Sequence, residues 1–183
     1  MNENAIGLIE LTSIATGFQV ADTLLKSADV RLLLARSICS GKYMVLVGGE
    51  VASVDTAVKA GCTAAAGFLI DHCVIPKVHP EVFAAICRSR PVEPTGALGI
   101  LESFNIANLI EAADTAVKAA DVTLLEIRLA MALGGKAFAT LTGDVSSVQA
   151  AVAAGRGVIA AAGLLVNAVV LPRPHPHVYR EML

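Results

Sequence analysis

The sequence predicts an α+β protein, an α/β sandwich in which one β-α-β-β-α-β-α unit occurs twice. The first observation is internal repetition: residues 5–36 align without gaps on residues 97–128, and nearly half of the aligned positions are identical. The second is that short apolar runs alternate with Ala-rich stretches of helical periodicity in both halves. We therefore expect a first domain at residues 4–90, a linker at residues 91–95 and a second domain at residues 96–183.

The first half shows how each element is predicted. Two apolar runs flank the short turn Cys39–Gly41, which is typical of a β-hairpin, and Thr12 or Ser13 can cap the first helix. In order, the expected elements are a strand Ala5–Leu11, a helix to about Ser27, strands Val30–Ile38 and Tyr43–Val47, a helix from Val51 to about Gly67, a strand within Phe68–Ile75 and a helix His79–Arg88.

This order is the split βαβ plan of ferredoxin-like domains. Helices cover one face of such a sheet, so its other face or its edges need a partner. The plan therefore favours oligomerisation. The linker is marked by Pro91 and Pro94, which block regular structure.

Composition excludes two classes of partner. The chain is 55% hydrophobic, but its longest apolar candidate, Val158–Leu171, is shorter than the roughly 20 residues that a spanning helix needs and contains Asn167. The net charge is −2 and neither half carries a basic stripe, so we expect neither membrane nor nucleic acid as a partner. The start, Met1–Asn4, lacks the basic flank of a signal peptide, which predicts a cytosolic protein.

The four cysteines have no metal-binding spacing. Cys39, Cys62, Cys73 and Cys87 form no CxxC pair, so we expect reduced thiols. Cys62 and Cys73, in a predicted helix and a predicted strand, are expected in the core. His72 stands next to Cys73, but neighbouring strand residues point to opposite faces and make a poor chelate.

Several spaced motifs carry a family resemblance. They are Ala97–Glu102, Ala113–Val122, Thr142–Val145 and the closing Pro172–His175, and the first half repeats them with Pro76–His79 at its end. Together they resemble the shell domains of bacterial microcompartments, and they cover nearly the whole chain twice. The resemblance implies a non-enzymatic tile in the microcompartment shell. It also implies a homotrimer of tandem chains that imitates a hexamer and packs edge to edge with other shell proteins.

The unpermuted element order, with a cysteine in the hairpin turn, narrows this resemblance. It is similar to the iron–sulfur-binding tandem shell proteins of propanediol-utilisation compartments. That similarity implies one [4Fe-4S] cluster per trimer, held at the central pore by three Cys39 thiolates with the fourth iron site open. The implied role is electron transfer across the shell or cluster delivery, with a luminal or cytosolic redox enzyme as partner. The implied pore-lining residues are Ile38, Ser40, Gly41, Leu133, Gly134 and Gly135.

The resemblance also implies contacts between tiles. Lys26 and Lys118 match the lysine that meets its counterpart across the boundary between two tiles. Arg173 matches the arginine of the closing motif, and Lys77 takes its place in the first half. Since arginine and lysine differ in hydrogen-bond geometry, alternate tile edges can differ in strength.

Three other hypotheses remain open at the level of sequence. Cys39 can be an ordinary small turn residue in a purely structural tile whose pore passes small polar metabolites. Three converging thiolates also suit a single zinc ion. Finally, the scaffold can carry an enzyme or a small-molecule sensor. The matched acids Glu10 and Glu102 suggest paired carboxylates, but duplication alone explains that pair.

Overall fold

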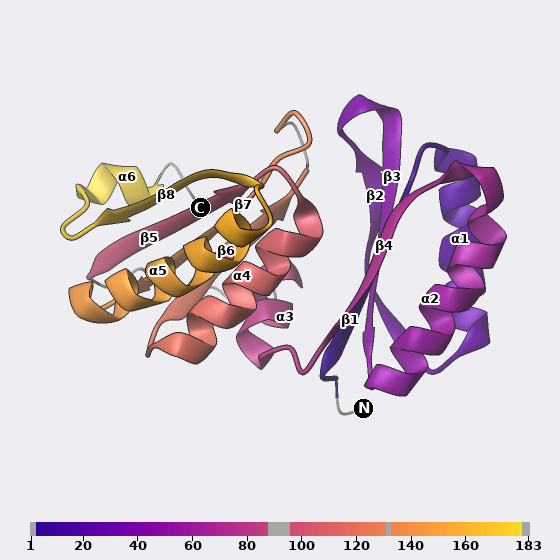
Figure 1. Cartoon of the computed structure of the whole chain (residues 1–183), viewed down its shortest axis with the longest axis horizontal. Helices are drawn as coiled ribbons and strands as arrows, with labels where there is room; N and C mark the ends of the chain where they lie inside the picture. The colour runs from indigo at the N-terminus through magenta and orange to yellow at the C-terminus, as the bar shows by residue number, and fades with distance from the viewer. Residues whose placement is uncertain (1–2, 88–95, 131–132, 181–183) are drawn as a thin grey trace. The chain divides into compact units, whose positions relative to one another are not determined.

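The computed structural model describes residues 3–87, 96–130 and 133–180 (Figure 1). Residue contacts divide the chain into two compact units. The described residues of the first unit are 3–80 and 133–135, and the remainder belong to the second. The linker expected at residues 91–95 lies outside the described residues.

The first unit is a four-stranded antiparallel sheet in the order β2-β3-β1-β4. Helices α1 and α2 pack on one face of this sheet (Figure 1). The bounds are β1 Ala5–Leu11, α1 Ile14–Ser27, β2 Val30–Ile38, β3 Lys42–Gly49, α2 Val51–Ala65 and β4 Leu69–Pro76. The predicted order of elements is confirmed, including the hairpin of β2 and β3.

Local chemistry explains where α1 begins. The hydroxyl of Ser13 accepts a hydrogen bond from the amide of Thr16 over 3.2 Å, which satisfies one of the amides left without a partner in the first turn. Ser13, rather than Thr12, is therefore the cap. Helix α2 ends at Ala65, earlier than predicted, because Ala66 adopts a positive φ of 47° and opens the 3-10 turn Ala66–Phe68.

The core of the first unit lies between the helices and the sheet. Ile9 and Val45 of the central strands pack with Leu24 of α1 and Val58 of α2 in one buried cluster. Helix α2 lies close to β1 because Gly7 has no side chain: a Cβ there would stand 2.6 Å from Cγ2 of Val58. This packing fixes the strands that carry the hairpin turn.

The second unit repeats the plan with the sheet order β6-β7-β5-β8. Its helices α4 and α5 cover one face of that sheet (Figure 1). The bounds are β5 Ala97–Ser103, α4 Ile106–Ala119, β6 Thr123–Leu129, β7 Ala137–Gly143, α5 Val145–Ala161, β8 Leu165–Leu171 and α6 Pro176–Arg180. Helix α3, Pro80–Cys87, follows β4 in sequence but groups from Glu81 onward with the second unit.

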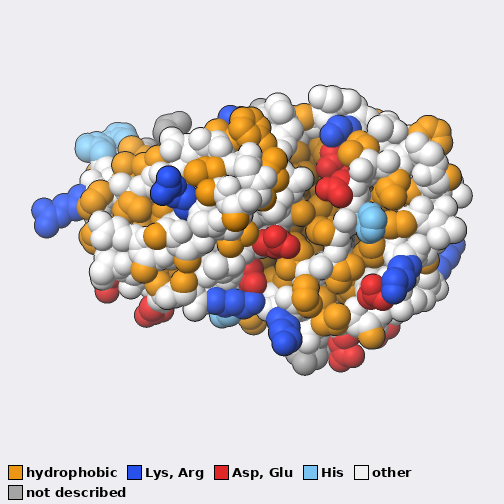
Figure 2. All heavy atoms as spheres, in the orientation of Figure 1, with side chains coloured by type: hydrophobic (Ala, Val, Ile, Leu, Met, Phe, Trp, Pro, Cys, Tyr) orange, Lys and Arg blue, Asp and Glu red, His pale blue; other side chains and the backbone are white. Residues whose placement is uncertain are grey.

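Two surface properties bear on function. Among the helices of the described ranges, none has both the length and the apolar character needed to cross a membrane. On the face seen in Figure 2, lysine and arginine side chains stand singly among neutral and apolar surface. That view shows no basic stripe.

Candidate functional site

The candidate site is the turn that joins β2 to β3. Ile38 and Lys42 pair across its base, and the 3-10 turn Cys39–Gly41 forms its tip. Ser40 and Gly41 have positive φ values of 64° and 71°, so the backbone reverses within very few residues. The Cys39 side chain is half-buried, Ser40 and Gly41 are exposed, and Ile38 is buried. The turn therefore presents a sulfur atom and open backbone, while Ile38 anchors its base.

The Cys39 thiol contacts the corresponding turn of the second repeat. The backbone amide of Leu133 donates a hydrogen bond to Sγ of Cys39 over 3.3 Å. Gly134 and Gly135 follow with φ values of 63° and 88°, and residues 133–135 group with the first unit. The structure thus joins the cysteine turn to the Leu133–Gly135 turn named from the sequence.

An ion pair secures the base of each turn. Nζ of Lys42 lies 2.8 Å from Oε1 of Glu10, which stands on the neighbouring strand β1. In the second repeat Lys136 makes the same contact with Glu102, over 2.5 Å. Sequence reasoning noticed the matched acids but missed their lysine partners. The Gly-Lys step that is repeated after each turn was the signal available in the sequence. Through these ion pairs the two acids hold the turns in position.

The described residues of a single chain do not assemble a metal centre of three or more ligands. Within the described ranges, no three His, Cys, Asp or Glu side chains converge on a point. The four cysteines, all described, are thiols rather than disulfides. Cys39 offers a soft sulfur ligand at an exposed turn, and the space around Gly41 is open, since a Cβ there would meet nothing within 4 Å. The residues therefore fit a thiolate-held cluster or a zinc ion only if several copies bring their Cys39 turns together.

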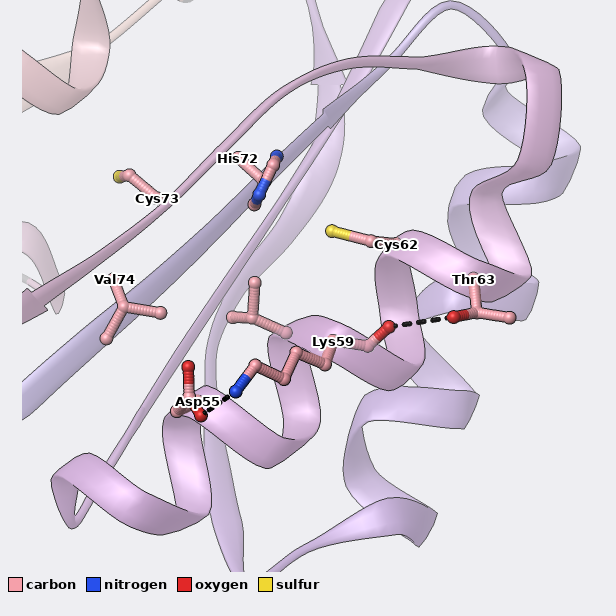
Figure 3. Close-up of a pocket in the computed structure, with 8 residues that line it drawn as sticks. Asp55, Lys59, Cys62, Thr63, His72, Cys73 and Val74 are labelled. Atoms are coloured by element: carbon pink, nitrogen blue, oxygen red, sulfur yellow. Dashed lines mark hydrogen bonds and ion pairs between the residues drawn. The ribbon is translucent and has the colours of Figure 1, made fainter.

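A second hollow lies in the first unit, between α2 and the edge strand β4 (Figure 3). Its volume is about 430 Å³. The sulfur of Cys62 extends from α2 toward the side of His72, whereas Cys73 points away from it on the other side of the strand (Figure 3). Lys59 pairs with Asp55 across one turn of α2, over 2.5 Å. The poor chelating geometry predicted for His72 and Cys73 is confirmed.

This hollow corrects one prediction. Cys62 and Cys73 were expected in the core, but both are only half-buried, and Cys62 packs against the core cluster rather than within it. The reason is that β4 is the last strand of its sheet, and the hollow between this strand and α2 leaves the flank of α2 partly open. Burial still raises the pKa of the Cys62 thiol above its usual value, which keeps that thiol protonated at neutral pH. A protonated thiol is a poor nucleophile, so the hollow lacks an activated cysteine at Cys62.

The four residues implied in tile contacts all lie at the surface. Lys26 lies in the last turn of α1 and forms an ion pair with Asp22 over 2.6 Å. Lys118 lies in the last turn of α4 and forms the matching ion pair with Asp114 over 2.5 Å. Lys77, with φ at 57°, and Arg173 are exposed just after β4 and β8. Each position is accessible to a neighbouring molecule.

Comparison with known proteins decides the family. The family model of the BMC domain matches residues 5–78 and again residues 97–174. The chain belongs to the BMC-domain family of bacterial microcompartment shell proteins. It is 42% identical over 179 residues to the bacterial microcompartment shell protein PduT of Citrobacter freundii, covering 98% of this chain and 97% of that one.

Solved structures and shorter relatives agree with this assignment. The crystal structure of a microcompartment protein from Desulfitobacterium hafniense superposes with a TM-score of 0.95 at 51% identity, covering 97% of this chain and 98% of that one. The shell protein EutM of Salmonella typhimurium is 42% identical over 79 residues, which is 43% of this chain and 80% of EutM. The chain is thus a tandem shell protein of the PduT type, and the family and fold predicted from the sequence are confirmed.

Proposed function

We propose that three copies of this shell protein form a pseudo-hexameric tile in which their Cys39 turns surround a central pore and hold one [4Fe-4S] cluster. The observation that carries the proposal is the placement of Cys39 on an exposed turn whose counterpart in the second repeat has no cysteine. In the second repeat, Leu133–Gly135 replaces it and supplies no thiol. Two unequal turns per chain give a threefold assembly three thiols, which alternate with three glycine turns.

The donor chemistry supports this proposal. Cubane clusters are held by Cys thiolates, usually four, so three Cys39 ligands leave one iron for water, a small ligand or a partner protein. When bound, such a cluster supplies one-electron redox chemistry. The proposed role is electron transfer across the shell, or delivery of the cluster to another protein, with a luminal or cytosolic redox enzyme as partner.

The chain's own residues prepare the turn for this role. The Leu133 amide donates to the Cys39 sulfur, and such hydrogen bonds tune the electronics of a sulfur ligand. The Glu10–Lys42 ion pair holds the base of the turn against β1. A ligand on a turn fixed at its base is presented with little conformational freedom, which favours binding.

The test is anaerobic purification followed by iron and acid-labile sulfide analysis and electron paramagnetic resonance. The expected result is about four iron atoms per three chains, and an iron–sulfur signal that Cys39→Ala abolishes while the oligomer persists. Cys73→Ala is the matched control and should keep the signal, because Cys73 lies on β4 and away from the turn. Wild-type protein without iron and sulfide would disprove the cluster, and zinc in its place would support a single-ion site.

A second function is favoured by the small residues of the two turns. A Cβ added at Gly41, Gly134 or Gly135 would meet nothing within 4 Å, so open space lies beside backbone groups of both turns. In a structural tile these groups would line a pore that passes small polar metabolites. Iron-free protein that still forms extended sheets by electron microscopy would favour this second function.

A further inference from the structure

The hollow between α2 and β4 is lined by a cysteine on one side and a histidine on the other. Cys62 extends its sulfur from α2 toward the side of β4 that carries His72 (Figure 3). His72 is exposed and Cys62 is half-buried, so a small ligand can reach both side chains from solvent. Among the described residues, neither this thiol nor this imidazole has a hydrogen-bond or ion-pair partner. A sulfur and a ring nitrogen are therefore available to a ligand in the hollow.

The packing of the first unit brings these two residues to one place. Gly61, next to Cys62, lets α2 approach β1 closely: a Cβ there would stand 2.5 Å from Cδ1 of Ile9. Ile9 pairs directly with His72 across β1 and β4, and directly paired residues of an antiparallel sheet share a face. His72 therefore lies on the sheet face that α2 covers, one strand away from the residue that the glycine contacts. A contact of the core thus fixes the positions of both side chains.

The second repeat keeps this packing and lacks the pair. In α5 the glycine that packs on β5 is followed by Arg156, where α2 has Cys62. On β8 the residue that pairs with Leu101 is Ala168, where β4 has His72. The shared fold therefore needs neither a thiol nor an imidazole at these two places, and the first repeat has both of them.

The two ligand types select a class of metal ion. Thiolate sulfur is a soft ligand that favours Cu(I) and zinc, and imidazole also suits copper and zinc. A zinc ion is bound by three or four protein ligands, but no third His, Cys, Asp or Glu of the described ranges converges on this pair. The carboxylate that lines the hollow, Asp55, is paired with Lys59. A soft monovalent ion such as Cu(I) is satisfied by two ligands, so it fits this pair better than zinc.

We propose that Cys62 and His72 bind one soft monovalent metal ion, of the class of Cu(I), in the hollow of the first repeat. Binding exchanges a proton for the metal: the S–H bond of Cys62 breaks, a sulfur–metal bond forms and the proton leaves to solvent. A ring nitrogen of His72 donates a lone pair as the second bond, and no electron is transferred. Because burial raises the pKa of the Cys62 thiol, its proton is present at neutral pH, and affinity should rise with pH.

The experiment titrates the Cys39→Ala protein anaerobically with Cu(I) in competition with a chromophoric Cu(I) chelator, so that the turn thiol does not compete. We expect one tightly bound Cu(I) per chain. Adding His72→Ala should weaken binding by about tenfold or more, since even loss of a group that supports a metal ligand costs about 10–100-fold. Adding Cys73→Ala is the control and should change nothing, because that sulfur points away from His72 (Figure 3). His72→Ala leaves the other thiols in place, so unchanged affinity in that variant would overturn the inference.

A transplanted site separates loss of a ligand from damage to the fold. Arg156→Cys together with Ala168→His puts the same pair on the same packing in the second repeat. We expect this double variant to bind a second Cu(I) per chain, with one sulfur and one nitrogen neighbour by X-ray absorption, whereas Arg156→Cys alone should not. Equal binding in the double and single variants would overturn the inference. The site does not rest on the proposed function, and a wild type without iron and sulfide would defeat the cluster and leave the Cu(I) site standing.

Discussion

The amide of Leu133 donates a hydrogen bond to the Cys39 sulfur over 3.3 Å, across 94 positions of sequence. A turn without a cysteine therefore contributes a donor to the turn that has one. Duplication followed by divergence has given the two turns complementary parts: one supplies the sulfur, and the other supplies an N–H group directed at it. This contact predicts that Leu133 affects a cluster held by Cys39 through its backbone rather than its side chain.

Replacing Leu133 by proline removes the amide hydrogen, whereas replacing it by alanine retains it. Hydrogen bonds to a cluster sulfur favour the reduced, more negative state, so their loss lowers the reduction potential. We expect Leu133→Pro to lower the midpoint potential by on the order of tens of millivolts and Leu133→Ala to leave it close to wild type. Redox titration followed by paramagnetic resonance measures both. Equal potentials in the two variants would show that the amide has no such effect.

Alanine substitutions at two glycines of α5 should have opposite effects on the stability of the fold. A Cβ at Gly155 would stand 2.6 Å from Cδ1 of Leu101 and 2.9 Å from the backbone oxygen of Ala112, which cannot move aside. Gly155→Ala should therefore destabilise the fold by roughly 1–3 kcal/mol. Gly157 is exposed in the same helix and has nothing within 4 Å, so Gly157→Ala should stabilise it by about 0.5–1 kcal/mol. Urea unfolding at a fixed protein concentration compares the two, and a loss of stability in Gly157→Ala would contradict the reasoning.

The parts of the fold that could be predicted from sequence are those determined locally. Ser13 caps α1 through an amide only a few residues away, and the bounds of β1 follow from a short apolar run. The exposure of Phe18 could not be predicted, because its equivalent Ile110 has the same helical periodicity and is fully buried. Which of two equal faces is covered depends on tertiary structure and not on the pattern within either helix.

Part of the candidate site could likewise be predicted from the sequence, and part of it could not. The turn around Cys39 was located from the sequence by its hairpin pattern and by the family resemblance. Its contact with Leu133 was not, because a hydrogen bond from a backbone amide leaves no signature in residue type. The half-exposed position of Cys62 was also missed, since an Ala-rich helix does not reveal that its flank meets the edge of a sheet.

The ion pair of Glu3 with Arg31 predicts a pH dependence of stability. The hydrogen bond from Arg31, with Nη2 2.6 Å from Oε2, lowers the pKa of Glu3 below 4.5. A lowered carboxyl pKa stabilises the fold above the unfolded-state value and loses that effect as the pH falls through the folded-state value. The gap in unfolding free energy between wild type and Glu3→Gln should therefore be constant near neutral pH and shrink below about pH 4.5. Unfolding at a series of pH values measures this gap. With Arg31→Met as background, the same comparison should show no such change.

Replacing the lysines near the ends of α1 and α4 should prevent the assembly of tiles into extended sheets without unfolding the protein. Lys26 is 74% exposed, and its pair with Asp22 one helical turn away contributes only about 0.2–0.5 kcal/mol, so little stability depends on it. If Lys26 and Lys118 join neighbouring tiles, the double variant Lys26→Ala with Lys118→Ala should keep the mass of the wild-type oligomer and form no extended sheets by electron microscopy. Lys59→Ala is the matched control, because Lys59 is 75% exposed and pairs with Asp55 in the same way on α2. Sheets that form normally in the double variant would place the contact between tiles elsewhere, with Lys77 and Arg173 as the next positions to replace.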